Sequence, residues 1–302
     1  MTIISTGSHP KALWEGMRRW WGREYGKHPK FHASIFDVVS STKAYEEDAE
    51  VTGFGLAPVK AQGADISFDG ETQGTVTRYT HVAYALGYIC TYEEQRDNLY
   101  EVVSRRRATA LAFSMETTRQ IVAANFFNRG FNSSYTFGDG KEAFATDHPT
   151  VDGTQSNELN PSADFSEGAL EDLLIQIMNT KNSRGLNIAL RAIDIFGPNN
   201  LAFDMTRVLK SELRSDTADN DVNAVRNMGL LGKAPIINPY LTDTDAWFLK
   251  TNCPNGLVFQ NREDVTFDQD NDFNSKNLKA AAYMRFSVGH TDFRGCYGSA
   301  GA

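Results

Sequence analysis

The segment between Thr91 and Gly130 contains neither glycine nor proline, the residues that most often interrupt helices. At its start, Thr91 and Glu94 have the spacing of a capping box, which predicts the beginning of a helix. A helix from Asp97 to Arg129 would be about 50 Å long at 1.5 Å per residue. Because a compact chain of 302 residues has about that diameter, the segment predicts a rod that spans the molecule. Its predicted apolar face comprises Leu99, Val103, Ala110, Phe113, Ile121 and Ala124.

Residues 75–91 alternate between two sets of β-forming side chains, which is the period of a strand. A weaker strand pattern covers Glu50 to Lys60, and the loop Ala61–Gly74 would join the two strands into a long hairpin. An isolated two-stranded hairpin is only marginally stable in water. We therefore expect this hairpin to lie on another protein surface.

The second half of the chain predicts shorter elements of both kinds. Ser166 precedes a pattern of Leu and Ile at helical spacing that ends by Gly185. The other expected elements are strands over 186–196, 236–241, 245–249 and 280–293, a helix from Pro198, and loops over 132–164 and 214–228. Together with the long helix, this order predicts an α+β fold.

Residues 1–45 predict an extended arm that must dock on a protein surface. The arm contains Trp14, Trp20 and Trp21, three of the four tryptophans of the chain, and side chains of this size are rarely left in water. They could pack on their own domain or on a neighbouring subunit. The first residues lack the basic start and apolar run of a signal peptide, and no later run is long enough to cross a bilayer. We therefore expect a soluble protein that stays where it is made and has no membrane partner.

The charge and cysteine content argue against several classes of protein. The chain has 38 Asp and Glu against 30 Lys and Arg, a net charge of −8, which disfavours nucleic-acid binding as its main role. Its three cysteines, Cys90, Cys253 and Cys296, form no C-x-x-C pair, which disfavours a disulfide scaffold and a cysteine zinc site. The composition is otherwise that of an ordinary globular chain.

No complete catalytic or nucleotide-binding motif is present. Gly53 and Gly55 are followed by Pro58 where a dinucleotide fingerprint has its third glycine. Asp147 and His148 are adjacent in the sequence, and adjacent side chains do not face each other as a catalytic base and its orienting carboxylate must. We expect this pair to form a turn, and we expect no catalytic residues and no cofactor.

The metal-ligand candidates are also incomplete. The acidic run 268–272 (DQDND) resembles the opening of a calcium loop, but Phe273 occupies the position of the required glycine and Lys279 that of the bidentate glutamate. We expect a solvated acidic turn there. His28 and His32 lie four residues apart without the glutamate of a zinc protease. We therefore expect no metal site.

Arg105, Arg106 and Arg107 form the one basic cluster of the sequence. On a helix, three consecutive residues spread over about 200° of the circumference, so these side chains cannot share one face. The cluster could bind a polyphosphate, form a solvated face, or pair with acidic side chains on another protein surface.

Five runs of sequence resemble the major capsid proteins of tailed bacteriophages. They are YEEDAEVTGFGLAPVKAQGA, RYTHVAYALGYICTYEE, RRRATALAFSMETTRQIVAANFFNRGF, DGKEAFATDHPT and RFSVGHTDFRGCYGS. The resemblance covers about residues 14–302, and it is similar to the Mu-like major head subunit branch of the Hong Kong 97-type shell proteins. It implies an α+β fold with an N-terminal arm, an extended loop (E-loop), a long spine helix, a peripheral domain and an axial domain.

The family plan implies five segments in this chain. They are the N-terminal arm over 1–45, the E-loop over 46–90, the spine helix and peripheral domain over 91–163, the axial domain over 164–277, and a C-terminal strand over 278–302 that returns to the peripheral domain. Some relatives carry a long, cleaved scaffolding segment before the E-loop, for which this sequence leaves no room. This implies either a separate scaffolding protein or a chain that has already been processed, and because the sequence begins with Met1 we expect the separate scaffolding protein.

The resemblance implies a structural protein that is not an enzyme. Hexamers and pentamers would tile the icosahedral capsid of a virion, which encloses double-stranded phage DNA, carries a portal protein and is assembled in the host bacterial cytoplasm. Some relatives cross-link a hairpin lysine to a neighbouring subunit; Lys60 lies in the corresponding element, but no motif fixes the reaction. The alternatives are an encapsulin-like compartment of the same fold and, from another class, a hydrolytic enzyme using His148 and Asp147.

The family plan places the hairpin of one subunit over the spine region of the next, which would bring two charge clusters together. We therefore expect ion pairs between subunits, in which acidic side chains at the base of the hairpin face the arginines of the long helix. The residues expected at subunit contacts are Glu46, Glu47, Asp48, Glu50, Arg105, Arg106, Arg107, Trp20 and Trp21.

Overall fold

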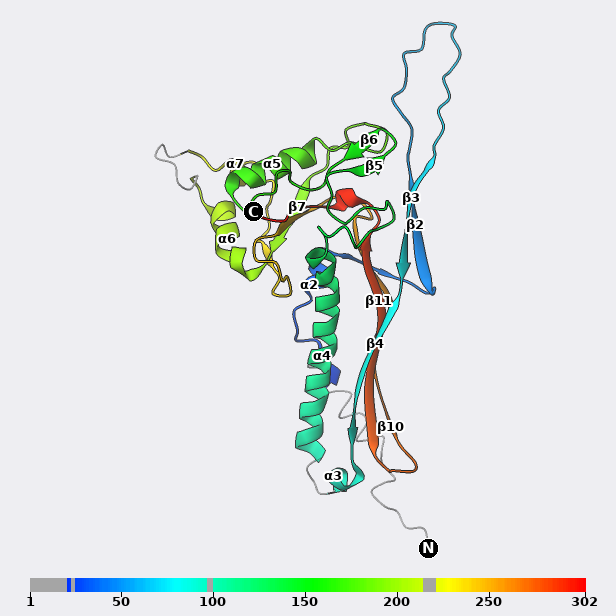
Figure 1. The fold of residues 1–302 in the computed structure, drawn as a ribbon, viewed down its shortest axis with the longest axis vertical. Coiled ribbons are helices and arrows are strands. Elements are labelled where there is room, and N and C mark those ends of the chain that lie inside the picture. The colour runs from blue at the N-terminus through cyan, green and yellow to red at the C-terminus, as the bar shows by residue number, and fades with distance from the viewer. Residues whose placement is uncertain (1–20, 23–24, 97–99, 214–220) are drawn as a thin grey trace.

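The computed structural model describes residues 21–22, 25–96, 100–213 and 221–302, with side chains described in these ranges apart from 95, 96 and 100–105. Figure 1 shows three parts: a rod made of one long helix and a long sheet, a lobe of short helices and strands at one end of the rod, and a hairpin that projects beyond the lobe. The three parts meet where the rod joins the lobe.

Helices and strands are both abundant in the described residues. The helices are α2 (Phe31–Ile35), α3 (Tyr92–Arg96), α4 (Tyr100–Asn128), α5 (Glu167–Met178), α6 (Ala202–Lys210) and α7 (Ala224–Asn227), with 3-10 turns η2 (Asn199–Leu201) and η3 (Phe293–Gly295). The strands are β1 (Asp37–Ser40), β2 (Tyr45–Val51), β3 (Gln73–Thr80), β4 (Val82–Cys90), β5 (His148–Thr150), β6 (Gly153–Gln155), β7 (Ala192–Gly197), β8 (Ile236–Ile237), β9 (Trp247–Thr251), β10 (Leu257–Asn271), β11 (Leu278–His290) and β12 (Cys296–Ser299). The expected α+β fold is therefore confirmed.

The predicted long helix is present as α4, whose 29 residues are about 43 Å long. The capping box lies on the short helix α3 instead, where the Glu94 N–H donates to Thr91 Oγ1 at 3.4 Å. The predicted apolar face was wrong in part: Phe113 and Ile121 are 53 % and 42 % exposed, whereas Ala124 is buried. The side chains of Leu99 and Val103 lie outside the described residues. Elements pack on more than one side of α4, and its buried positions include polar Glu116, so apolar spacing alone selects the wrong face.

The long sheet of the rod has the strand order β1-β10-β11-β4 and packs along α4 (Figure 1). β10 and β11 are antiparallel, with Phe259 opposite Val288 and Phe267 opposite Ala282. β10 was not predicted, and the expected acidic turn at 268–272 is largely its last part, 268–271. The sequence of β10 does not look like a strand for two reasons. More of its positions are exposed than buried, so it contains many acidic and polar residues. Two register shifts also interrupt the alternation of its side chains.

The hairpin is shorter than expected at its base. β2 pairs with β3, from Tyr45 opposite Thr80 to Ala49 opposite Val76. The chain then leaves the hairpin at His81, and β4 pairs with β11 in the long sheet. His81 is buried between two hydroxyl groups, 3.0 Å from Ser41 Oγ and 3.0 Å from Ser287 Oγ, which fixes the point of transfer. The segment 82–90, expected in the E-loop, thus belongs to the rod.

The lobe contains a second core around the sheet β12-β9-β7-β8. The predicted cap of α5 is confirmed, since the Ser166 hydroxyl accepts from the Ala169 N–H at 3.2 Å, although the helix ends at Met178 and not near Gly185. Leu170 and Ile177 on α5 are buried in this core together with Trp247 and Tyr297.

Strand pairing divides the C-terminal part differently from the expected segments. Residues 257–271, expected in the axial segment 164–277, form a strand of the rod, whereas β12, in the segment 278–302, pairs with β9 in the lobe. Long-range pairing decides both placements, and neither is visible in local periodicity. In the described ranges, no helix has the length and apolar character needed to cross a membrane.

Candidate functional site at the base of the hairpin

The acidic run of the hairpin lies on β2, where alternate side chains point to opposite sides. Glu46, Asp48 and Glu50 are half-buried and face the subunit's own body, whereas Glu47 is exposed. Each of the three inward carboxylates has a partner in the same subunit. The base of the hairpin is therefore a built polar site, and its acidic residues do not form a free acidic surface.

Asp48 is tied to the end of the rod by a chain of hydroxyl groups. The Thr291 hydroxyl donates to Asp48 Oδ2 at 3.0 Å, and Tyr79 Oη lies 2.7 Å from the same hydroxyl. Tyr79 is only 2 % exposed, and burial raises the pKa of its phenol well above the ordinary value. A neutral Tyr79 then donates to the Thr291 hydroxyl, which in turn donates to Asp48. Each of the two hydroxyl groups therefore has a hydrogen-bond partner.

Glu50 reaches a buried guanidinium that joins all three parts of the molecule. Glu50 Oε1 lies 3.6 Å from Arg294 Nη1 and accepts a hydrogen bond from the Ser183 hydroxyl. Arg294, 2 % exposed, also donates to the Lys181 carbonyl at 2.8 Å and to Asp292 Oδ1 at 3.1 Å. A buried charge needs such partners because removing it from water is costly.

Arg184 clamps both arms of the hairpin from the lobe. Its guanidinium donates to the Gly53 carbonyl at 3.3 Å and to the Gly70 carbonyl on the opposite arm, and it lies 3.5 Å from Asp69 Oδ1. Hydrogen bonds from the backbone N–H groups of Gly55 and Gly70 lower the pKa of Asp69, and Arg184 adds to this effect. Arg184 was not predicted from the sequence, because no local signal marks an arginine whose partner lies 114 residues away in the chain.

Glu46 and Glu47 have partners within the hairpin and in the segment just before it. Glu46 accepts from Lys43 Nζ at 2.9 Å and from the Ser41 hydroxyl at 2.8 Å, and these hydrogen bonds lower the pKa of its carboxyl. Glu47 lies 3.6 Å from Arg78 Nε, and the guanidinium of Arg78 stacks over the Tyr45 ring. Lys43 and the Glu47–Arg78 pair are largely exposed, so water screens these contacts and they add little to stability.

The basic cluster on α4 lies apart from this site. Arg107 forms a two-pronged pair with Glu94 of α3, at 2.8 and 2.9 Å, whereas β2 lies toward the other end of α4 (Figure 1). Arg106 is exposed, and the side chain of Arg105 lies outside the described residues. Among the described side chains of one subunit, the acidic and basic clusters therefore do not meet, and the pairing expected between subunits stays a prediction.

The sequence left open whether the tryptophans of the N-terminal arm pack on their own domain or on a neighbouring subunit. Trp21 is 7 % exposed and stacks on Tyr25 at 4.9 Å and on Phe267 of β10 at 5.7 Å between ring centroids. The structure therefore favours packing on its own subunit, and Trp21 offers little surface for a subunit contact. Trp14 and Trp20 lie outside the described residues.

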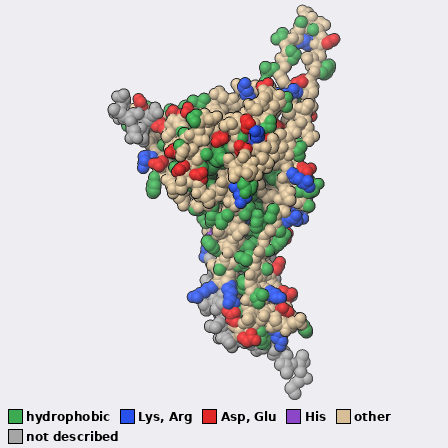
Figure 2. Space-filling model, viewed as in Figure 1, with side chains coloured by type: hydrophobic (Ala, Val, Ile, Leu, Met, Phe, Trp, Pro, Cys, Tyr) green, Lys and Arg blue, Asp and Glu red, His purple; other side chains and the backbone are tan. Residues whose placement is uncertain are grey.

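The outer part of the hairpin, between β2 and β3, exposes large apolar side chains. They are Phe54 at 60 %, Leu56 at 82 %, Val59 at 100 %, Ile66 at 65 % and Phe68 at 92 %, and Figure 2 shows apolar side chains on this projection. We name residues 52–72 the tip. Lys60 lies exposed in the tip. Such a cluster on a projecting element marks a surface that a partner covers.

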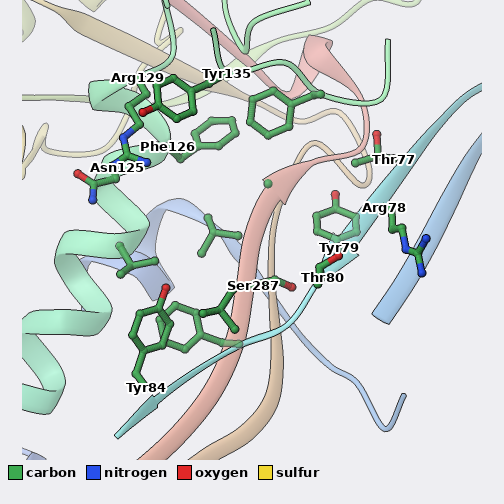
Figure 3. Close-up of a pocket in the computed structure, with 16 residues that line it drawn as sticks. Thr77, Arg78, Tyr79, Thr80, Tyr84, Asn125, Phe126, Arg129, Tyr135 and Ser287 are labelled. Atoms are coloured by element: carbon green, nitrogen blue, oxygen red, sulfur yellow. The ribbon is translucent and has the colours of Figure 1, made fainter. Parts of the chain in front are cut away.

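A groove of about 400 Å³ lies beside the base of the hairpin, between β3, β11 and the C-terminal half of α4 (Figure 3). Tyr79, Tyr84, Asn125 and Arg129 are among the side chains that surround it. Thr77, Arg78, Tyr79 and Thr80 of β3 border the groove, so it adjoins the base of the hairpin.

The candidate catalytic pair does not form. Asp147 pairs with Lys141 at 2.5 Å, whereas His148 Nδ1 lies 2.5 Å from Asp139 Oδ2 and His148 Nε2 lies 2.9 Å from Asn157 Oδ1. His148 is fully buried and starts β5, so the expected turn is a short strand. With both ring nitrogens occupied and no exposed surface, His148 cannot reach a substrate.

The candidate metal ligands also lie apart or have other partners. Asp272 accepts from Lys279 Nζ at 2.9 Å, and this hydrogen bond lowers the pKa of its carboxyl. His28 stacks edge-on against Phe113, whereas His32 is buried against Gln120. Among the described residues, no three His, Cys, Asp or Glu side chains gather as potential metal ligands.

Family comparison identifies the class of protein that carries this fold and hairpin. The model of the phage capsid protein family matches residues 74–299, about three quarters of the chain. The chain belongs to this family, and it is a structural major capsid protein with a Hong Kong 97-type fold. No curated protein matches the chain.

Solved structures share the fold at low sequence identity. A virus-like particle from Pyrococcus furiosus is 11 % identical with a TM-score of 0.57, over 95 % of this chain and 99 % of the other. The capsid of a native GTA particle is 12 % identical with a TM-score of 0.55, over 89 % and 90 %. The procapsid of bacteriophage JBD30 is 13 % identical with a TM-score of 0.51, over 98 % and 76 %. These likenesses establish the fold.

Replacing Arg294 tests whether the guanidinium stabilises the junction of the three parts. Arg294→Met leaves Glu50 and Asp292 without their buried cation, so we expect the free energy of unfolding to fall by about 3–5 kcal/mol in urea denaturation followed by circular dichroism. The control is Arg207→Met, which removes an exposed pair with Asp204 and should cost less than about 1 kcal/mol. Equal effects of the two variants would contradict a structural role for Arg294.

Two buried histidines predict loss of stability in acid. Burial lowers the pKa of His290 and of His32 from 6.5 to about 4, and Arg119 adds to the effect at His32. Between pH 6.5 and 4 the unfolded chain binds protons that the folded chain does not, so the free energy of unfolding should fall by up to about 3 kcal/mol per histidine. Urea denaturation at several pH values measures this slope. The variant His290→Asn should show a shallower one, and a wild-type slope of zero over this interval would contradict the assignment.

Proposed function

We propose that this chain is the major head subunit of a tailed bacteriophage and assembles through hexamers and pentamers into an icosahedral shell around double-stranded phage DNA. The observation that carries the proposal is the anchored hairpin, whose base is fixed to its own subunit and whose tip projects with five exposed apolar side chains. A single subunit leaves this surface in water. Copies that cover one another's tips remove it, and repeated identical contacts build closed assemblies.

The charge of the chain supports enclosure of DNA without strong binding. A net charge of −8 gives little overall attraction for phosphate. A shell confines DNA by closure, and a strongly basic lining would hold the genome in place during packaging. The acidic balance is therefore compatible with a container for DNA.

The proposal includes partners and a place of assembly that follow from the resemblance. A separate scaffolding protein would direct assembly, a portal protein would occupy one position in the shell, and assembly would take place in the host bacterial cytoplasm before the subunit becomes part of the virion. The proposal includes no enzymatic activity, and the burial of His148 supports this part.

The second candidate is an encapsulin-like compartment of the same fold. Likeness to a virus-like particle from Pyrococcus furiosus supports a shell of this architecture, but at 11 % identity it does not distinguish the contents. The match to the phage capsid family over residues 74–299 favours the phage head. Purified particles that hold a protein cargo and no DNA would favour the compartment.

Assembly of the purified chain tests the proposal directly. We expect concentrated protein, alone or expressed with the scaffolding protein of its phage, to sediment as particles in the megadalton range and to form closed shells in negative-stain images. As a control, dilute protein should sediment more slowly than these particles. A chain that stays monomeric under all of these conditions is not a shell subunit.

The exposed arginine of the basic cluster tests the expected ion pairs between subunits. We propose that Arg106 pairs with acidic side chains such as Glu47 of an adjacent copy. Arg106→Glu should leave the circular dichroism spectrum unchanged but reduce the yield of shells, and added salt should weaken wild-type assembly because exposed pairs are screened. Arg207→Glu, on the lobe, is the matched charge reversal. Equal shell yields for wild type and Arg106→Glu at every salt concentration would mean that Arg106 is a solvated side chain.

A further inference from the structure

One side-chain amide holds residues 25–34, which we name the strap, on α4. The strap includes most of α2, which lies against α4 (Figure 1). The His32 backbone N–H donates to Gln120 Oε1 at 3.0 Å. The amide nitrogen of Gln120 lies 2.6 Å from His32 Nδ1 and 2.5 Å from Glu116 Oε1. Because the amide oxygen is already an acceptor, the amide nitrogen donates in both of the other contacts.

This arrangement determines where His32 carries its proton. Nδ1 accepts from the Gln120 amide, so the ring is neutral and its hydrogen is on Nε2. A protonated ring carries a hydrogen on both nitrogens, and the one on Nδ1 would point at the N–H of the amide. Two donors that face each other repel. Protonation of His32 therefore breaks the contact that joins the strap to α4.

The charged groups around His32 do not compensate for this loss. Glu116 Oε1 lies 3.9 Å from Nδ1, beyond hydrogen-bond distance, and it already accepts a hydrogen bond. Arg119 of α4 and Lys30 of the strap both disfavour a positive ring, and Asp264 of β10 is paired with Arg119 at 2.8 Å. Burial and Arg119 together lower the pKa of His32 from 6.5 to about 4. The closed strap thus excludes the proton.

Polar atoms beside the strap would gain partners if it opened. Trp21 stacks on Tyr25 of the strap, and the Arg119 guanidinium lies 5.8 Å from the same ring. Trp21 Nε1, Glu116 Oε2 and Arg119 Nε are buried and have no hydrogen-bond partner among the residues that the structure describes. A buried polar atom without a partner is costly, and water supplies one when the contact opens. The closed contact is therefore easier to open than its apolar burial alone suggests.

The strap ends at a segment that is fixed to the rod. Ile35 and Phe36 are 1 % and 2 % exposed, and the ring of Phe36 packs against Phe126 and Phe127 of α4. The four residues of β1 follow and pair with β10. Opening of the strap therefore stops at Ile35 and leaves the long sheet intact.

We propose that the strap is a proton-operated latch, in which protonation of His32 breaks its contact with Gln120 and residues 25–34 leave α4 while the long sheet stays folded. In the open strap His32 is in water, so the open form binds a proton that the closed form does not. With pKa values of 6.5 and about 4, the ratio of closed to open strap should fall about twentyfold between pH 6 and pH 4.5. The latch is a property of the single subunit and does not depend on the proposed function.

Hydrogen exchange of the purified protein at pH 6 and pH 4.5 tests the latch, with each rate divided by the intrinsic rate at that pH. The amides of His32 and Phe36 report the strap, because they donate to Gln120 Oε1 and to the His32 carbonyl. The amides of β10 that pair with β11 report the sheet. We expect protection of the strap amides to fall about twentyfold in acid and to stay at least ten times lower than that of β10. Equal protection of strap and β10 at both pH values would mean that the strap opens only when the whole fold unfolds.

Two variants separate His32 from the other buried histidine. In His32→Asn, the new amide oxygen can accept from Gln120 but does not titrate, so strap protection should change less than threefold between pH 6 and pH 4.5. The matched control is His290→Asn, which should keep the wild-type response of the strap. If His32→Asn responds to acid as the wild type does, or if His290→Asn abolishes the response, His32 is not the latch.

A measurement on the wild type keeps the test independent of the variants. Nitrogen-15 NMR of the histidine rings should show His32 neutral at pH 6, with its hydrogen on Nε2, and should show it gaining a proton over the same pH interval in which the strap amides lose protection. A protonated His32 under a strap that remains protected would overturn the inference.

Discussion

One buried guanidinium determines how the three parts of the molecule are held together. Arg294 lies just before β12 and reaches the hairpin through Glu50, the lobe through the Lys181 carbonyl and the end of the rod through Asp292. Because a buried charge is stable only with all of its partners in place, the hairpin cannot change its direction without disturbing the lobe. The direction of the projecting tip is therefore a property of the folded subunit.

The sequence predicted those elements whose signals are local. The uninterrupted segment after Thr91 gave a long helix, and the Ser166 cap placed α5, because caps and glycine or proline breaks act within a few residues. β10 was missed because acidic residues and register shifts mask its alternation. The apolar face of α4 was misplaced because α4 buries polar side chains as well, among them Glu116.

The candidate site shows the same division between local and distant information. The acidic run on β2 was found, and its pairing between subunits stays a prediction. Its contacts within the subunit, from Thr291 to Asp48 and from Arg294 to Glu50, were not predicted. These partners lie more than 200 residues away in the sequence, so only the folded structure brings them together. The apolar tip and the groove were missed for a related reason: exposure is a property of the whole fold, and the spacing of apolar residues does not report it.

The passage of one continuous strand from the hairpin into the rod has a mechanical consequence. Only His81 separates β3 from β4, and β4 is hydrogen-bonded along its length to β11. A pull on the tip is thus transmitted directly to the rod, since no flexible loop intervenes to take up slack. A pull along β4 acts on the hydrogen bonds between β4 and β11 in shear. These bonds then carry the force together and do not break one after another. If tips join neighbouring subunits, a force on one subunit would be distributed along the rods of its neighbours.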